Sequence, residues 1–282
     1  MNPVCFTIGS RPIYWYGVTM ALAFLAGMGH WTLLARREGR DVSLAGDLAF
    51  WIMLAGIVGA RAAHVASEWS YYRTVPSEIV RVDQGGMTFY GGFILAAVAV
   101  VVFARARRLP FLDLCDFVVT ALPLGHALGR VGCFLNVCCY GKLTTGALGI
   151  CYPAHFTTAL GETMDNPVWA AQVRAGLLPK LAPASLPVHP VQLYEAGFNL
   201  LVYALLTVFY LRGRRGRHGL VLAAYLILYP PGRFLLEYLR GDERLQVGVL
   251  DGAQALSLAF MAVGAALWFW ISRRHENAPH AA

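Results

Sequence analysis

The stretch Met87–Ala104 reads MTFYGGFILAAVAVVVFA, and it decides the fold. It carries no charged residue, and its length approaches the roughly 20 residues that a helix needs to cross the hydrocarbon core of a bilayer. A run of this kind predicts a transmembrane helix.

The composition of the whole chain points to lipid as the solvent. Its 282 residues are 57% hydrophobic and only 14% charged, whereas a soluble domain carries about 25% charged residues. The mean hydropathy is +0.54. We therefore expect an all-α integral membrane protein.

Seven apolar runs of this kind predict about seven transmembrane helices. Their approximate bounds are Ile13–Leu34, Leu44–Ala66, Met87–Ala104, Phe111–Leu128, Val191–Leu211, Leu220–Tyr238 and Gln254–Ile271. A glycine-punctuated block, Gly129–Gly141, follows the fourth run. This divides the chain into residues 1–140 with four helices and that block, a small external head at 141–190, and residues 191–282 with three helices and a C-terminal tail.

The arginines predict the orientation of these helices. Four clusters follow the first, third, fifth and seventh runs: Arg36, Arg37 and Arg40; Arg105, Arg107 and Arg108; Arg212, Arg214, Arg215 and Arg217; Arg273 and Arg274. Seven crossings place all four on one side, which the positive-inside rule makes the cytoplasm. The N-terminus and the 141–190 head then lie outside. The net charge of +7 is explained by these clusters, so we expect no nucleic-acid partner.

A charged side chain inside an apolar run costs free energy when the helix enters a membrane. Each such charge therefore suggests a functional role. Arg130 and Arg233 lie beside glycine or proline, in GRVG and PPGR, where a backbone can open around a ligand. Two converging guanidinium groups suit a phosphate, because each binds its oxygens in a bidentate fork. Glu237 lies four residues after Arg233 on one helical face and is a candidate ion-pair partner. For Arg61 and Asp116, ion pairs that hold the helices together explain the charge equally well.

Two further motifs are weaker. Gly91 and Gly92 end GGMTFYGG, where backbone N–H groups can approach an anion, but the same glycines also suit close packing of helices. His189 in HPVQLYE is a base, a ligand or an interface residue. Tyr16 lies at the expected outer interface, where tyrosine is common.

The six cysteines form no disulfide framework and no pair with histidines at zinc spacing, so we expect no metal site. Cys133, Cys138 and Cys139 lie close together in sequence. Adjacent side chains diverge, which favours reduced, buried thiols that act in packing.

In order along the chain, these blocks resemble the bacterial prolipoprotein diacylglyceryl transferase family. They are IYWYG, GGMTFYGG, LDLCDF, LGRVGCFLNVCCYGKLT, HPVQLYE, RFLLEYLR and DGAQALSL. Each block is weak alone, but their joint order and spacing over nearly the whole chain are specific.

The resemblance implies an inner-membrane enzyme of lipoprotein biosynthesis. It would move diacylglyceryl from phosphatidylglycerol to the lipobox cysteine of a preprolipoprotein signal peptide, release glycerol phosphate, and need no cofactor. The family roles in binding and catalysis pass to the matching positions Tyr16, Arg130, Asn136, Arg233, Glu237 and Arg240.

The chain departs from the family pattern at three positions of the core. Tyr90 replaces a histidine, and Cys133 and Cys138 replace an asparagine and a glutamate. The general base is left open among Tyr90, His126, His189 and Glu237. Two other functions remain: a related lipid-modifying transferase with a different acceptor, and a lipid-binding or transport protein without catalysis. A proton-coupled transporter would show repeat symmetry, and the sequence shows none.

Overall fold

A computed structural model describes residues 2–9, 11–82, 85–157, 161, 163–213, 217–241, 246–247 and 250–276. Within these ranges, seven segments are helical and are long and apolar enough to cross a membrane. They are α1 (Trp15–Arg37), α2 (Ser43–Ser67), α4 (Phe89–Ala106), α5 with α6 (Phe111–Val119 and Leu122–Leu135), α8 (Val191–Arg212), α9 (Leu220–Glu237) and α10 (Gly252–Glu276). The predicted all-α fold with seven candidate spans is confirmed.

Short elements connect these helices. The helical ones are α3 (Trp69–Tyr72), a 3-10 turn (Pro76–Val80) and α7 (Pro167–Arg174). The strands form three antiparallel pairs: β1 with β2 (Val4–Ile8, Arg11–Tyr14), β3 with β4 (His155–Thr157, Thr163–Asp165), and β5 with β6 (Gln246–Val247, Leu250–Asp251). Arg214 and Arg215 of the third arginine cluster lie outside the described residues.

The fourth span differs from its predicted form. It breaks between Val119 and Leu122, because Pro123 in the first turn of α6 lacks an N–H donor and disfavours a helical residue before it. It then continues to Leu135, and the predicted end at Leu128 is wrong. Gly132 does not end the helix: a Cβ there would lie 2.1 Å from Oγ1 of Thr19, so this glycine lets α1 and α6 touch. Arg130 therefore lies inside the span and not after it.

The chain divides into two compact units. Unit 1 comprises Met1–Ala26 and Val119–Ala282, and unit 2 comprises Gly27–Val118. The break between α5 and α6 coincides with the boundary between them. Each unit is described by itself.

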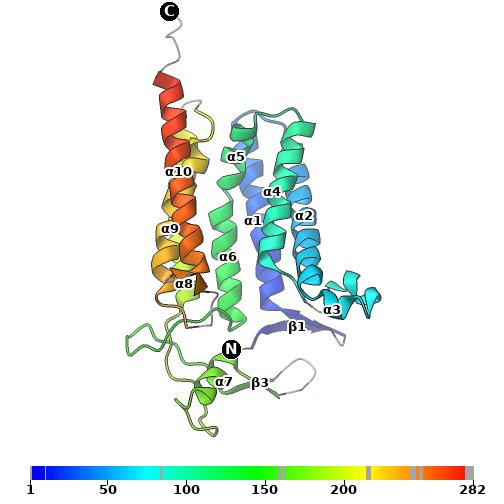
Figure 1. The fold of residues 1–282 in the computed structure, drawn as a ribbon, viewed down its shortest axis with the longest axis vertical. Helices are drawn as coiled ribbons and strands as arrows, with labels where there is room; N and C mark the ends of the chain where they lie inside the picture. The colour runs from blue at the N-terminus through cyan, green and yellow to red at the C-terminus, as the bar shows by residue number, and fades with distance from the viewer. Residues whose placement is uncertain are drawn as a thin grey trace, which may run out of the picture. The chain divides into compact units, whose positions relative to one another are not determined.

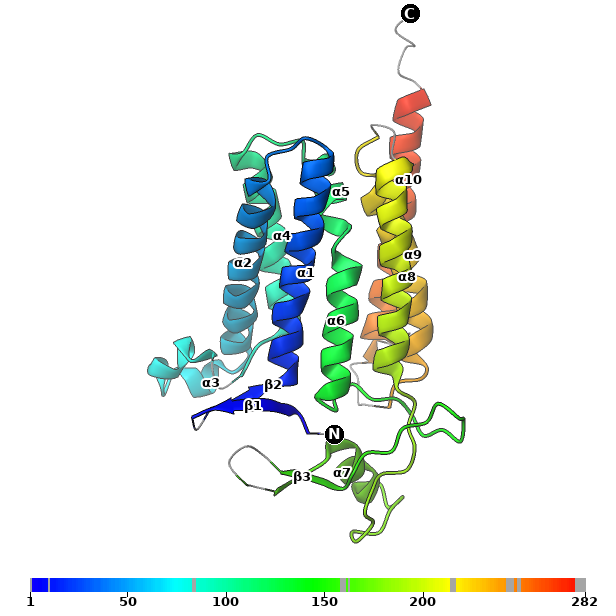
Figure 2. The same cartoon turned by 180° about the vertical axis from the view of Figure 1, so that it is seen from behind.

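In unit 2, α2 and α4 pack closely along a line of glycines (Figure 2). A Cβ at Gly59 would lie 2.4 Å from the Gly91 carbonyl oxygen, and one at Gly91 would lie 2.4 Å from the Gly59 oxygen. A Cβ at Gly92 would lie 2.9 Å from the Gly56 oxygen. Small residues let the backbones of membrane helices approach, so the packing role predicted for these glycines is what the contacts show.

Arg61 of α2 has a structural role in the same unit. Its buried guanidinium donates to the carbonyl oxygens of Ile79 at 2.8 Å and of Gly85 and Gly86 at 3.0 Å each. It also lies 5.1 Å from the ring centroid of Tyr72. Arg61 thus organises the loop that precedes α4, instead of forming the ion pair that we weighed for it.

The close approach of α2 and α4 predicts the effect of a single methyl group. Gly91→Ala should lower the thermal stability of the protein, because overpacking of a tight contact costs about 1–3 kcal/mol. Gly46→Ala is the matched control, since nothing lies within 4 Å of a Cβ at Gly46 of α2. Thermal unfolding in detergent measures both. Equal melting temperatures for the two variants would rule out the packing role of Gly91.

In unit 1, α8, α9 and α10 lie side by side, and α6 packs against α8 (Figure 1). Helix α9 runs through Pro230 and Pro231 without ending. Gly232 does not open the backbone around a ligand as the sequence suggested. A Cβ at Gly232 would lie 2.3 Å from the ring of Phe198, so this glycine brings α9 against α8.

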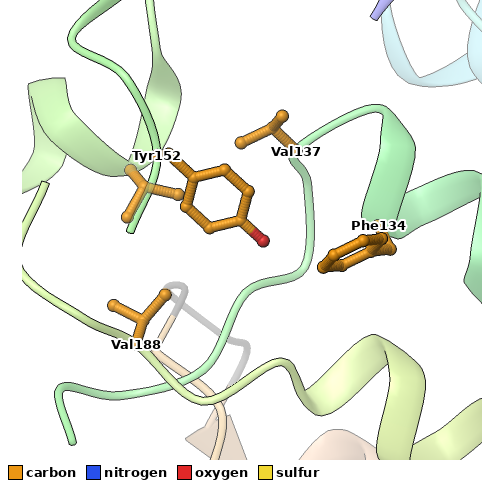
Figure 3. Packing of buried hydrophobic residues seen from close by; sticks show 5 residues of the cluster. Phe134, Val137, Tyr152 and Val188 are labelled. Carbon is orange, nitrogen blue, oxygen red and sulfur yellow. The ribbon is translucent and has the colours of Figure 1, made fainter. Parts of the chain in front are cut away.

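The head at residues 141–190 shares a hydrophobic core with the end of α6. Phe134, Val137, Tyr152, Val168 and Val188 are all buried in one cluster. Figure 3 shows the ring of Tyr152 between Val137 and Val188, with its hydroxyl on the side of Phe134. This packing anchors the segment that follows α6, which carries the cysteines.

Candidate active site

Two arginines from different helices of unit 1 meet at one buried carboxylate. Nε of Arg130 on α6 lies 3.0 Å from Oε1 of Glu195 on α8, and Nε of Arg233 on α9 lies 4.0 Å from the same oxygen. The Glu195 side chain is 1% exposed, while that of Arg130 is 23% exposed. The carboxylate thus holds both guanidinium groups near one point, and Arg130 keeps its accessible edge.

Glu237 adds a second carboxylate to this cluster. Nη1 of Arg233 donates to Oε2 of Glu237 one turn further along α9, which confirms the predicted pair. Arg240 follows α9 and is buried. Arg130 and Arg233 balance the charges of Glu195 and Glu237, and Arg240 adds a positive charge that acts on Cys139.

The cluster is held by contacts of the first three turns of α8. Nδ2 of Asn199 donates to the Glu195 carbonyl oxygen at 2.8 Å, and both residues are buried. Nε2 of Gln192 donates to the carbonyl oxygen of Cys138 at 2.8 Å. The start of α8 therefore positions both the bridging carboxylate and the loop that follows α6.

That loop begins with a Schellman motif. The N–H of Val137 donates to the Phe134 carbonyl oxygen at 3.1 Å, and the N–H of Cys138 donates to that of Cys133 at 3.1 Å. Val137 takes the left-handed position, with φ of 54°, where glycine is usual. A branched residue in this conformation costs about 1–3 kcal/mol, and its burial in the core of Figure 3 offsets the cost.

Cys133 in the last turn of α6 and Cys138 and Cys139 in the loop converge. A Schellman motif brings the side chains of its first and last positions together, and here these are Cys133 and Cys138. Cys139 also has a positive φ, 61°, and the three sulfur atoms lie within 4.8 Å of one another. The expectation that the side chains of Cys138 and Cys139 diverge is wrong. Hydrogen bonds from Cys133 and Cys138, with the charges of Arg240 and Arg130, lower the pKa of the Cys139 thiol.

Other predicted site residues surround this cluster. The ring of Tyr16 lies against α6, 3.3 Å from the position of a Cβ at Gly132. Asn136 is the C-cap residue of α6, and its side chain forms a hydrogen bond with the Cys138 thiol. His189 lies just before α8, where its Nδ1 is 3.5 Å from the Tyr194 hydroxyl. The contact of His189 is the one expected of an interface residue.

Tyr90, Gly91 and Gly92 belong to unit 2, which is described by itself. Gly91 and Gly92 face α2 as described above. Tyr90 is exposed and packs its ring edge-on against Phe89, 5.8 Å between centroids. The catalytic role of Tyr90 and the substrate-binding roles of the two glycines stay predictions.

Glu195 is the functional residue that sequence reasoning did not select. It lies near the start of the fifth apolar run, but nothing in the sequence shows that it would face two arginines. His126, a candidate base, lies on α6 with its ring tilted by 45° against that of Tyr229 of α9, 5.3 Å between centroids. In the sequence, both Glu195 and His126 stand out in the same way, as titratable side chains within an apolar run.

Comparisons with known proteins agree with this geometry. The family model described as prolipoprotein diacylglyceryl transferase matches residues 3–270. Three relatives are named phosphatidylglycerol–prolipoprotein diacylglyceryl transferase. One, from Nostoc, is 32% identical over 99% of this chain and 92% of its own length. The others, from Synechococcus elongatus and Symbiobacterium thermophilum, are 34% and 31% identical over 99% and 97% of this chain, and over 90% and 94% of their own lengths.

The match spans the three helices that contribute to the arginine cluster, α6, α8 and α9. The cluster lies within the membrane-spanning helices, as an enzyme that acts on a lipid requires. The chain therefore belongs to the prolipoprotein diacylglyceryl transferase family, whose members are multi-pass membrane proteins of lipoprotein modification.

Proposed function

We propose that this protein transfers diacylglyceryl from phosphatidylglycerol to the lipobox cysteine thiol of preprolipoproteins and releases glycerol phosphate. The observation that carries the proposal is the meeting of Arg130 and Arg233 at the buried Glu195 carboxylate. A phosphodiester carries one negative charge, and two converging guanidinium groups can bind its oxygens in bidentate fashion.

Each arginine has a role in the reaction. The thiolate sulfur attacks the glyceryl carbon, the bond from this carbon to the phosphate oxygen breaks, and the electron pair leaves with glycerol phosphate. Negative charge on the departing phosphate grows, and the guanidinium groups of Arg130 and Arg233 stabilise it. Burial excludes water, which would otherwise hydrolyse the lipid.

The remaining predicted residues support this chemistry. Glu237 holds Arg233, and Arg240 adds positive charge near the cysteine loop. Tyr16, Asn136 and His189 are the remaining candidates for substrate binding. Tyr90, His126, His189 and Glu237 remain the candidates for the base that takes the thiol proton. The partners are phosphatidylglycerol, the preprolipoprotein signal peptide and surrounding membrane lipids.

One assay separates a transferase from a lipid-binding or transport protein. Full-length protein in phosphatidylglycerol vesicles is mixed with a lipobox peptide, and the peptide is analysed by mass spectrometry. We expect the mass of one diacylglyceryl group on the cysteine and one glycerol phosphate released per modified peptide. Lipid binding without either product would support the non-catalytic function, and modification of a different acceptor would support the related transferase.

We further propose that the protein lies in the bacterial inner membrane with its N-terminus in the periplasm and its C-terminus in the cytoplasm. The support is that each of the four arginine clusters follows an odd-numbered span along the chain. The 141–190 head then faces the periplasm, beside the outer leaflet.

Thiol labelling of intact cells tests this orientation. In a background with Cys5→Ser and Cys151→Ser, a membrane-impermeant thiol reagent should label Leu181→Cys in the head, where Leu181 is 96% exposed. The same reagent should label Arg217→Cys only after the cells are opened. The reverse pattern would place the head in the cytoplasm and contradict the orientation.

A further inference from the structure

The sulfur atoms of Cys133, Cys138 and Cys139 form a cluster that the reaction described so far does not use. They lie within 4.8 Å of one another, and each cysteine is partly accessible. In a tetrahedral site with zinc–sulfur bonds of about 2.3 Å, the sulfurs lie about 3.8 Å apart. The three side chains therefore need to close by only about 1 Å to ligate one ion.

The backbone that carries Cys138 and Cys139 has an unusual conformation, and neighbouring contacts hold it in place. Val137 and Cys139, on either side of Cys138, both have positive φ values. This is a conformation that L residues rarely adopt, and it is held here by the buried side chain of Val137 and by the bond from Gln192 to Cys138. Packing alone needs no such arrangement, because any one of the three thiols would fill space from a relaxed loop.

The charges around the cluster suit a thiolate-bound metal. Three thiolates and one Zn(II) ion carry a net charge of −1. Arg130 and Arg240 both act electrostatically on Cys139, and they supply compensating positive charge. Thiolates select soft or borderline ions such as zinc over magnesium or calcium.

Among the described residues, the group that lies close enough to share an ion consists of these three cysteines. Three protein ligands are typical of catalytic zinc sites, in which the fourth position is left for water or substrate. A thiol that takes such a position loses its proton outright.

We propose that Cys133, Cys138 and Cys139 bind one Zn(II) ion, and that the acceptor thiol of the peptide substrate takes the fourth position. The binding of the acceptor thiol to the ion extends the proposed function and rests on it. The substrate thiol coordinates the ion and transfers its proton to the base that the proposed function leaves open among Tyr90, His126, His189 and Glu237. The resulting thiolate then forms the bond to the glyceryl carbon, while the electron pair of the broken carbon–oxygen bond leaves with glycerol phosphate. The site lies beside Arg130, so acceptor and leaving group are held by adjacent groups.

The metal site is tested by stoichiometry. Reduced full-length protein in detergent is loaded with Zn(II), freed of excess ion and analysed for bound metal. We expect about one zinc per chain, lost in Cys133→Ser, Cys138→Ser and Cys139→Ser. The matched control is a variant in which Cys5, Cys115 and Cys151 are all serine, which should keep the ion. Less than stoichiometric zinc in the parent protein, or equal zinc in the cluster variants, would overturn the proposal.

The fourth position is tested with Co(II) in place of zinc, because sulfur ligation of Co(II) gives visible and charge-transfer bands. A lipobox peptide with cysteine should change this spectrum, and the same peptide with serine should not. An unchanged spectrum with both peptides would overturn substrate ligation. If the ion and the spectral change are present but no diacylglyceryl is transferred under any condition, the proposed function fails while the site stands.

Discussion

Arg130→Ala and Arg233→Ala are each expected to lower turnover of phosphatidylglycerol by about 100- to 1,000-fold, the usual loss when one donor to a developing charge is removed. The reason is geometric. The two guanidinium groups come from α6 and α9 and converge at Glu195, so neither can replace the other. The measurement is the initial rate of glycerol phosphate release from phosphatidylglycerol vesicles.

The control for this loss is Arg174→Ala, which removes an exposed arginine from α7 in the head and should keep parental turnover. Each variant is compared at equal amounts of folded protein, judged by its melting temperature. Near-normal turnover in Arg130→Ala and Arg233→Ala would remove the phosphate-clamp role and the main support for the proposed transfer reaction.

Glu195→Gln is expected to cost about 3–5 kcal/mol of stability, as when one partner of a buried ion pair is removed. The carboxylate is 1% exposed and faces two guanidinium groups, and its loss would leave Arg130 without its paired carboxylate while Arg233 keeps Glu237. Glu195 acts through the arginines, so its role is positioning. The melting temperature should fall, and Glu195→Asp should restore part of both stability and turnover.

The matched control is Glu68→Gln, at an exposed position after α2. Turnover at saturating lipid distinguishes a role of Glu195 in positioning the arginines from a role in stabilising the fold alone. If Glu195 positions the arginines, turnover at saturating lipid should stay low in Glu195→Gln even at temperatures where the variant is fully folded. Full turnover under those conditions would show that Glu195 only stabilises the fold.

The spans were predictable because a bilayer imposes a length and an apolar composition on each helix. Their ends were less predictable. Gly129 and Gly132 suggested an end to the fourth span, but a glycine in a membrane helix also allows close helix contact, and Thr19 against Gly132 shows that use. The same ambiguity applies to Gly232, which packs on Phe198. Only the tertiary contacts decide between the two uses.

The site was partly predictable for a similar reason. Arg233 and Glu237 are four residues apart on one helix, so their pairing followed from helical geometry. The meeting of Arg130 with Glu195 joins α6 to α8 across a long loop, and no local rule predicts it. The convergence of the cysteines depends on the left-handed backbone conformation of Val137. Glycine is usual in this conformation, and its absence here means that the sequence does not indicate the turn.

The lysine variants test the central claim most directly. Lysine keeps the positive charge but loses the planar fork that binds two phosphate oxygens. We predict that Arg130→Lys and Arg233→Lys each lose most turnover, with rates close to those of the alanine variants. Glycerol phosphate release at saturating phosphatidylglycerol is the measurement. Recovery to near-parental rates in both lysine variants would contradict the bidentate clamp and would leave only a local positive potential at the site.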